Sequence, residues 1–117
     1  MEQIKSKPFF LKDEEQVYLA DKGITRQFVG YNNAIMTVKV IFEKGAIGYQ
    51  HSHPHVQTAY IESGVYEVTI NGETKTLKAG DGFFAEPNIM HGLVCLEAGV
   101  IIDTFSPVRE DFYNTIK

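Results

Sequence analysis

Histidine is the residue type whose placement in this chain points most directly to chemistry. The chain has four histidines: His51, His53 and His55 lie within five residues of one another, and His91 follows much later. Neutral imidazole is the commonest protein ligand for divalent transition metals. In an extended strand, residues two apart point to the same side, so His51 and His53 can bind one ion from one strand face. The alternative interpretation is a chance cluster of surface or core histidines.

A second group of reactive side chains lies near the C-terminus. The chain has only two arginines, and one of them, Arg109, follows shortly after Asp103 and Phe105. Asp103 and Phe105 share one face of the last expected strand. If that face lines the interior, Arg109 can bind a substrate carboxylate there through its planar fork. A surface ion pair of Arg109 with Glu110 or Asp111, which would contribute little to stability, explains the arginine equally well.

Length and composition describe one domain of ordinary globular character. The chain has 117 residues, of which 44% are hydrophobic and 22% charged, enough for one hydrophobic core. The net charge of −4 argues against nucleic acid as a partner, because phosphate contacts require a basic face. No apolar run approaches the ~20 residues that a membrane span requires. The single cysteine, Cys95, has an apolar strand context that predicts a packed thiol, and the lack of any internal disulfide favours the cytoplasm.

Short alternations of apolar and polar residues, separated by turn residues, predict an all-β barrel or sandwich. Residues 34–42 show the clearest period of two. Asn71-Gly72 predicts a two-residue hairpin turn, and Asn32-Asn33 predicts a weaker one. We expect nine or ten short strands and no helix before residue 109. Besides residues 34–42 and the histidine segment, the expected strands cover residues 16–20, 24–30, 57–62, 65–70, 73–77, 82–85, 92–97 and 100–105.

These segments divide the single expected domain, residues 1–117, into three parts. An N-terminal arm covers about residues 1–15, a barrel about residues 16–106, and a C-terminal tail residues 107–117, which forms a short helix or crosses the barrel. The arm is mostly polar, and its one apolar cluster is Pro8-Phe9-Phe10-Leu11. We expect this apolar cluster to dock against the barrel or against a second subunit.

The histidines and the glycines around them resemble the two sequence motifs of the cupin family. The first motif is matched at every spacing, with glutamine where the family usually has glutamate, by Gly45, His51, His53, Gln57 and Gly64. The second motif is matched by Gly80 and His91, and the chain departs from it at Glu86, Asn88 and Cys95. Asparagine tolerates a positive φ, so Asn88 can keep the turn that the motif makes with glycine. The resemblance implies a double-stranded β-helix, the cupin jelly-roll barrel.

The resemblance also implies one divalent metal ion in the mouth of the barrel. Its expected ligands are His51, His53, Gln57 and His91. His55 is expected at the rim of the site, because Pro54 interrupts the strand beside it. A neutral Gln57 leaves the full charge of the ion uncompensated, which favours Lewis-acid chemistry and an anionic substrate. Zn²⁺, Ni²⁺, Mn²⁺ and Fe²⁺ all suit this ligand set, and Gln57 can alternatively be a buried polar side chain with partners inside the barrel.

Within the cupins, the C-terminal segment and the glutamine are similar to the KdgF type, small proteins that linearise unsaturated uronates in pectin and alginate breakdown. The acidic, aromatic and arginine residues implicated in that type correspond to Asp103, Phe105 and Arg109. This implies metal-dependent ring opening of 4,5-unsaturated monouronates, with Asp103 and Arg109 catalytic, and with Phe105, Arg109 and His55 binding substrate. An iron-dependent dioxygenase and a non-enzymatic binding barrel are the alternatives. Small cupins commonly pair, so a homodimer is expected.

Overall fold

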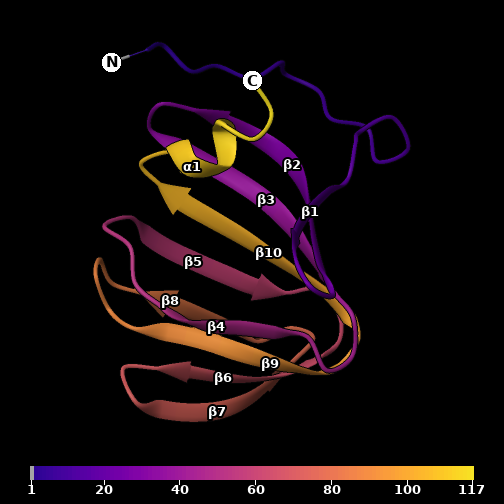
Figure 1. Ribbon diagram of the computed structural model, residues 1–117, viewed down its shortest axis with the longest axis vertical. Helices are drawn as coiled ribbons and strands as arrows, with labels where there is room; N and C mark the ends of the chain where they lie inside the picture. The colour runs from indigo at the N-terminus through magenta and orange to yellow at the C-terminus, as the bar shows by residue number, and fades with distance from the viewer. Residues whose placement is uncertain (1) are drawn as a thin grey trace.

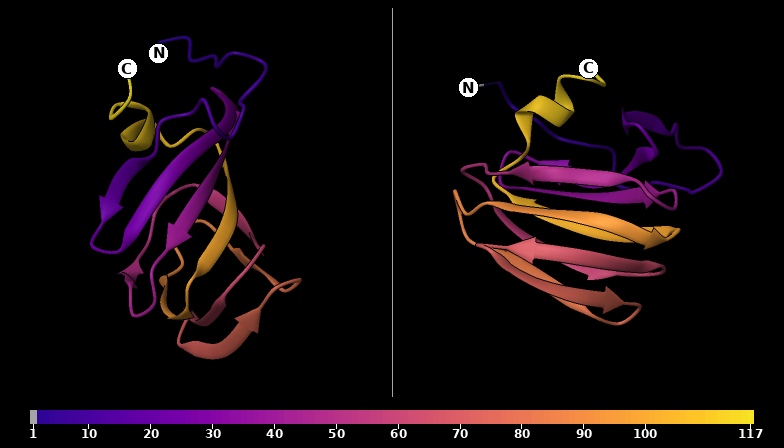
Figure 2. Two further views of the ribbon diagram at one scale, coloured as in Figure 1. Left: turned by 90° about the vertical axis from the view of Figure 1, so that its right-hand side faces the viewer. Right: turned by 60° about the horizontal axis from the view of Figure 1, so that its bottom comes forward.

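Two antiparallel β-sheets face each other in the computed structural model, which describes residues 2–117 (Figure 1). The larger sheet has six strands in the order β1-β2-β3-β10-β5-β8, and the smaller has four in the order β4-β9-β6-β7. Their bounds are β1 Tyr18–Asp21, β2 Ile24–Asn32, β3 Ile35–Phe42, β4 Ile47–His51, β5 Val56–Ile61, β6 Val65–Ile70, β7 Glu73–Lys78, β8 Gly82–Ala85, β9 His91–Glu97 and β10 Gly99–Ser106. A short helix, α1 Glu110–Tyr113, follows near the N-terminal arm (Figure 2).

The alternation of residues along β3 determines where the core lies. Met36, Val38, Val40 and Phe42 are buried, and the residues between them are more exposed. Side chains of the smaller sheet meet them from the other side, as in the edge-to-face contact of Phe42 with Tyr66 at 5.3 Å between ring centroids. The expected all-β architecture is therefore confirmed, because the period-two pattern faces one apolar interior between the sheets.

Two turns bring the second histidine segment beside the first. Asn71 and Gly72 have φ values of 49° and 83°, as the expected type I′ hairpin between β6 and β7 requires. Asn88 has φ 67°, and its backbone N–H donates to the carbonyl of His53 at 2.7 Å. Asn88 thus keeps the predicted turn and fixes the entry to β9, which begins at His91.

One expected turn lies a residue later than the sequence suggested. Asn32 pairs with Ile35 at the end of β2, so Asn33 and Ala34 form the turn in place of Asn32-Asn33. The side-chain oxygen of Asn32 accepts the N–H of Ala34 at 2.8 Å, an Asx turn that uses the first asparagine as the anchor. The expected strand bounds shift by similar small amounts elsewhere.

The N-terminal arm lies along the larger sheet. Ile4 is buried, and Phe10 packs against Tyr31 with ring centroids 6.3 Å apart. Phe9 and Leu11, in contrast, are 77% and 57% exposed. The apolar cluster of the arm is therefore divided between contact with the sheet and contact with solvent. Among residues 2–117, no helix is long and apolar enough to cross a membrane.

Candidate metal centre

Three histidines meet where the ends of β4 and β9 pair. His51 and His91 are cross-strand partners in the smaller sheet, and their ring centroids are 4.4 Å apart. His53 follows β4, is buried, and its ring centroid lies 4.8 Å from that of His91. One ligand atom from each histidine lies within 4.8 Å of the others. The sequence spacing that predicted this convergence is therefore realised by one strand pair and the loop after β4.

Backbone carbonyls select the tautomer of all three rings. The Nδ1 atoms of His51, His53 and His91 lie 2.8, 3.0 and 2.9 Å from the carbonyl oxygens of residues 49, 55 and 89. A carbonyl oxygen can only accept, so each Nδ1 carries the proton and each neutral ring presents an unprotonated Nε2. Metal-binding histidines have this arrangement, in which one nitrogen donates to the protein and the other is free to bind the ion.

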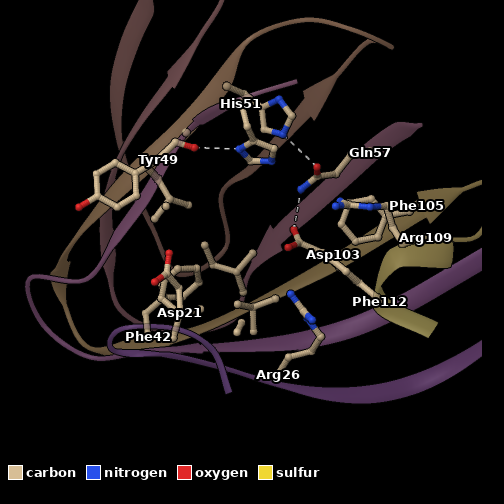
Figure 3. Close-up of a pocket in the computed structure, with 18 of the residues that line it drawn as sticks. Asp21, Arg26, Phe42, Tyr49, His51, Gln57, Asp103, Phe105, Arg109 and Phe112 are labelled. Carbon is tan, nitrogen blue, oxygen red and sulfur yellow. Dashed lines mark hydrogen bonds between the residues drawn. The ribbon is translucent and has the colours of Figure 1, made fainter. Parts of the chain in front are cut away.

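Gln57 completes the group from the opposite sheet. Its Oε1 atom lies 3.0 Å from Nε2 of His53 and 3.2 Å from Nε2 of His91. Its Nε2 atom donates to Oδ1 of Asp103 at 3.0 Å. Because a carboxylate accepts and an amide NH₂ donates, Asp103 fixes the orientation of the amide and turns its oxygen toward the histidines (Figure 3).

The donor set fits a cation. With the tautomers set by the carbonyls, the unprotonated nitrogens of His53 and His91 and the oxygen of Gln57 direct lone pairs at one another. Such a convergence is unfavourable unless a positive ion or a proton lies between the atoms. Burial lowers the pKa values of His53 and His91, which keeps both rings neutral and free to bind. These residues, together with His51, can therefore hold a metal ion.

Asp103 lies on the inward face of β10, beside the metal group, defined as His51, His53, Gln57 and His91. It pairs with Val38 on β3 and Ala59 on β5, in the middle of the larger sheet. Desolvation by burial raises the pKa of Asp103 to about 7, against the opposing effects of the Gln57 hydrogen bond and the charges of Arg109 and Arg26. A carboxyl group of this kind can take up and release a proton near neutral pH.

Aromatic rings surround the second arginine of the chain. The guanidinium carbon of Arg109 lies 4.9 Å from the ring centroid of Phe105 and 4.0 Å from that of Phe112. Its Nε and Nη2 atoms donate to the two carboxylate oxygens of Asp111 at 3.0 and 2.8 Å. The ion pair with Asp111, one of the two alternatives left open by the sequence, is thus present, but Arg109 is 9% exposed and lines the cavity as well. Three of its five N–H donors are left over from this pair.

His55 has a different environment from the other three histidines. Its Nε2 atom contacts the carbonyl oxygen of Val108 at 3.2 Å, and its buried Nδ1 atom has no hydrogen-bond partner among residues 2–117. The ring lies edge-on to His53, with centroids 5.5 Å apart. His55 therefore connects the loop after β4 to the C-terminal segment and does not belong to the group of three histidines.

A cavity of about 320 Å³ opens beside the metal group. Its wall includes His51, Gln57, Asp103, Phe105 and Arg109, and Figure 3 shows them around one space. The wall also includes Arg26, which sequence reasoning did not select. Its position between Ile24 and Phe28 on one face of β2 gives only a weak signal, because Gln27 on the other face is buried as well.

Comparison with known proteins identifies the family of the chain. The cupin domain family matches residues 38–105, which is more than half of the chain. The chain belongs to the cupin family. This cupin is also 47% identical over 106 residues to the pectin degradation protein KdgF of Dickeya dadantii, a match that covers 89% of this chain and 96% of the relative.

Two solved structures have the same fold over nearly their whole length. An RmlC-like cupin from Shewanella frigidimarina is 44% identical with a TM-score of 0.90, covering 96% of this chain and 99% of the other. KdgF from Halomonas sp. is 38% identical with a TM-score of 0.87, covering 92% and 99%. The expected jelly-roll barrel and the resemblance to KdgF are thereby confirmed.

Proposed function

We propose that this cupin is a metal-dependent enzyme that opens the ring of a 4,5-unsaturated monouronate to give a linear keto acid. The observation that carries the proposal is the placement of Asp103 beside three imidazoles and an amide oxygen that converge in one cavity. The similarity to proteins named KdgF supports the class of substrate. The reaction is an isomerisation: the hemiacetal opens to an aldehyde and an enol, and protonation of the enol on carbon gives the ketone.

His51, His53, Gln57 and His91 would hold the ion. A divalent Zn, Ni, Mn or Fe ion bound there would act as a Lewis acid toward substrate oxygens and would attract an anionic ligand. All four ligands are neutral, so the protein itself does not reduce the charge of the ion. The protein contributes the orientation of the ligands, through the three backbone carbonyls and through Asp103.

Asp103 would carry the proton that is transferred within the substrate during ring opening. Its position on the cavity wall allows it to take a proton from a substrate hydroxyl and return it to carbon. Phe105 would pack against the sugar ring, and Arg109 would use the donors that Asp111 leaves free to contact the carboxylate. The role of His55 in substrate binding remains a prediction, and its contact with Val108 supports an indirect role at the rim.

The experiment is a ring-opening assay on unsaturated galacturonate, followed by loss of the ultraviolet absorbance of the conjugated alkene. We expect metal-loaded protein to exceed the spontaneous rate in buffer, with no oxygen consumption and with equal rates under anaerobic conditions. Asp103→Asn keeps an acceptor for Gln57, so metal should stay bound while turnover falls roughly 10²–10⁴-fold.

Two results would contradict this proposal at different points. A wild-type rate no greater than that of buffer on every unsaturated uronate tested would refute the function. A variant Asp103→Asn that is as fast as wild type would refute only the proton-transfer role.

A further inference from the structure

Arg26 lies on the inward face of β2 among core residues. Its neighbours on that face, Ile24 and Phe28, are buried, and its cross-strand partner Val40 is buried as well. Strand alternation therefore directs the Arg26 side chain into the barrel. A cationic side chain rarely occupies such a position unless a partner compensates the lost hydration.

Arg26 has no direct polar partner among the protein groups of residues 2–117. Its Nε atom is buried and has no hydrogen-bond partner, and none of the salt bridges formed within residues 2–117 involves it. Its contact is with the ring of Phe112, whose centroid lies 3.5 Å from the guanidinium carbon. A cation–π contact holds the group in place but gives the buried Nε donor no acceptor.

The two arginines of the cavity differ in whether a carboxylate of the protein pairs with them. Arg109 lies 4.0 Å from the same Phe112 ring and has a bidentate partner in Asp111. Arg26 has no such bidentate partner. Desolvation and the like charge of Arg109 lower its pKa, and the charges of Asp111 and Asp103 oppose this without forming a salt bridge to it. The wall thus contains one arginine that is paired directly with a carboxylate and one that is not.

We propose that Arg26 binds the carboxylate of the ligand in this cavity, next to Arg109. The planar fork of a guanidinium matches a carboxylate with two parallel hydrogen bonds, which would use the unpaired Nε donor. Figure 3 shows Gln57 and His51 on one side of Asp103 and Arg26 on the other. A ligand held by Arg26 would therefore place its carboxylate away from the histidines and its other oxygens toward them, with Asp103 between.

The identity of the ligand as a monouronate rests on the proposed function, so the test measures binding and turnover separately. Metal-loaded wild type, Arg26→Met and Arg26→Lys are titrated calorimetrically with saturated galacturonate, and KM and kcat are measured on unsaturated galacturonate. Lys39→Met is the matched control, because it removes one positive charge from the outer face of the neighbouring strand β3.

We expect Arg26→Met to raise both Kd and KM roughly 10–100-fold, the scale of a lost charge-assisted hydrogen bond, with kcat and bound metal close to wild type. Arg26→Lys should recover only part of the affinity, because it restores the charge without the fork. Lys39→Met should bind like wild type. If Arg26→Met does not fold, the test rests on the affinity of Arg26→Lys for galacturonate. Wild-type affinity for galacturonate in Arg26→Lys would then overturn the proposal.

The remaining outcomes separate this inference from the proposed function. Wild-type affinity in Arg26→Met, or a fall in kcat with unchanged affinity, would overturn the inference while ring opening by wild type still stood. Arg26-dependent binding of galacturonate without ring opening would support the inference and refute the proposed function. Wild type that neither binds nor opens any uronate would refute both.

Discussion

At the scale of single residues, the contact between Gln57 and Asp103 explains an amide where the cupin motif usually has a carboxylate. The Gln57 amide donates to Asp103 at 3.0 Å and accepts nothing from it. A glutamate at position 57 would place two carboxylates at this distance, and one of them would have to bind a proton. The glutamine is therefore matched to the aspartate that faces it.

A substitution tests this match. Gln57→Glu should retain bound metal, because it still offers an oxygen ligand, but should weaken galacturonate binding, because it lowers the charge of the site by one. The double variant Gln57→Glu/Asp103→Asn restores a donor facing an acceptor and should be more stable to thermal unfolding than Gln57→Glu alone. Metal analysis, calorimetry and thermal unfolding measure the three quantities. Tighter galacturonate binding by Gln57→Glu would contradict the charge argument.

The histidines give a second prediction at this scale. His51→Ala and His91→Ala should each lose most of the bound metal, because each removes one of the three converging imidazoles. His55→Ala is the matched control and should keep the metal, since the His55 ring contacts Val108. Elemental analysis after dialysis provides the measurement. Near-wild-type metal in both ligand variants would refute the ligand assignment.

The sequence predicted the metal group more completely than the rest of the cavity, for a physical reason. His51 and His53 are two residues apart, and a period of two is readable in any extended segment. The direction of Arg26 is harder to read, because buried residues occur on both faces of β2. The barrel interior lies on one side, and on the other Gln27 donates from a buried position to the arm carbonyls of Lys12 and Glu15. An arginine in such a strand does not reveal its direction.

At the scale of the elements, a close approach between two turns joins the sheets. Backbone groups of Ser63 and Val100 hydrogen-bond to each other in both directions at 3.1 Å. Gly64, the last glycine of the first motif, has φ 91°, and a Cβ there would lie 2.6 Å from the carbonyl oxygen of Glu97. At Gly99, a Cβ would collide with the backbone carbonyl of Ser63. The motif glycine is thus required by packing as well as by its backbone angle.

This contact predicts that alanine destabilises the protein much more at Gly99 than at Gly30. Gly99→Ala should lower the free energy of unfolding by roughly 3 kcal/mol, because the colliding atoms belong to the backbone and cannot rotate away. Gly30→Ala should change it by less than about 0.5 kcal/mol, since a Cβ there meets nothing within 4 Å. Chemical denaturation of both variants gives the comparison. Equal free energies of unfolding for the two variants would show that the turn at Gly99 can move away from Ser63 without loss of stability.

At the scale of the whole molecule, exposed apolar side chains gather along the arm and the edge of the larger sheet. Phe9 and Leu11 of the arm are exposed, and so are Val17 and Leu19 beside or within β1. β1 is the last strand at its edge of the six-stranded sheet, so no strand of the described residues pairs with its outer backbone groups. An uncovered edge with apolar side chains is a favourable surface for association.

We therefore predict a homodimer with the arm at its interface. Light scattering at micromolar concentration should give twice the mass of the chain, and deletion of residues 1–12 should give the monomer mass. Because that deletion also removes the buried Ile4, a second variant, Phe9→Ser/Leu11→Ser, keeps the docked part of the arm and changes only its exposed side chains. It should shift the equilibrium toward monomer while metal content and melting temperature stay near wild type. A monomeric wild type, or a dimer that both variants leave intact, would place the interface elsewhere or exclude it.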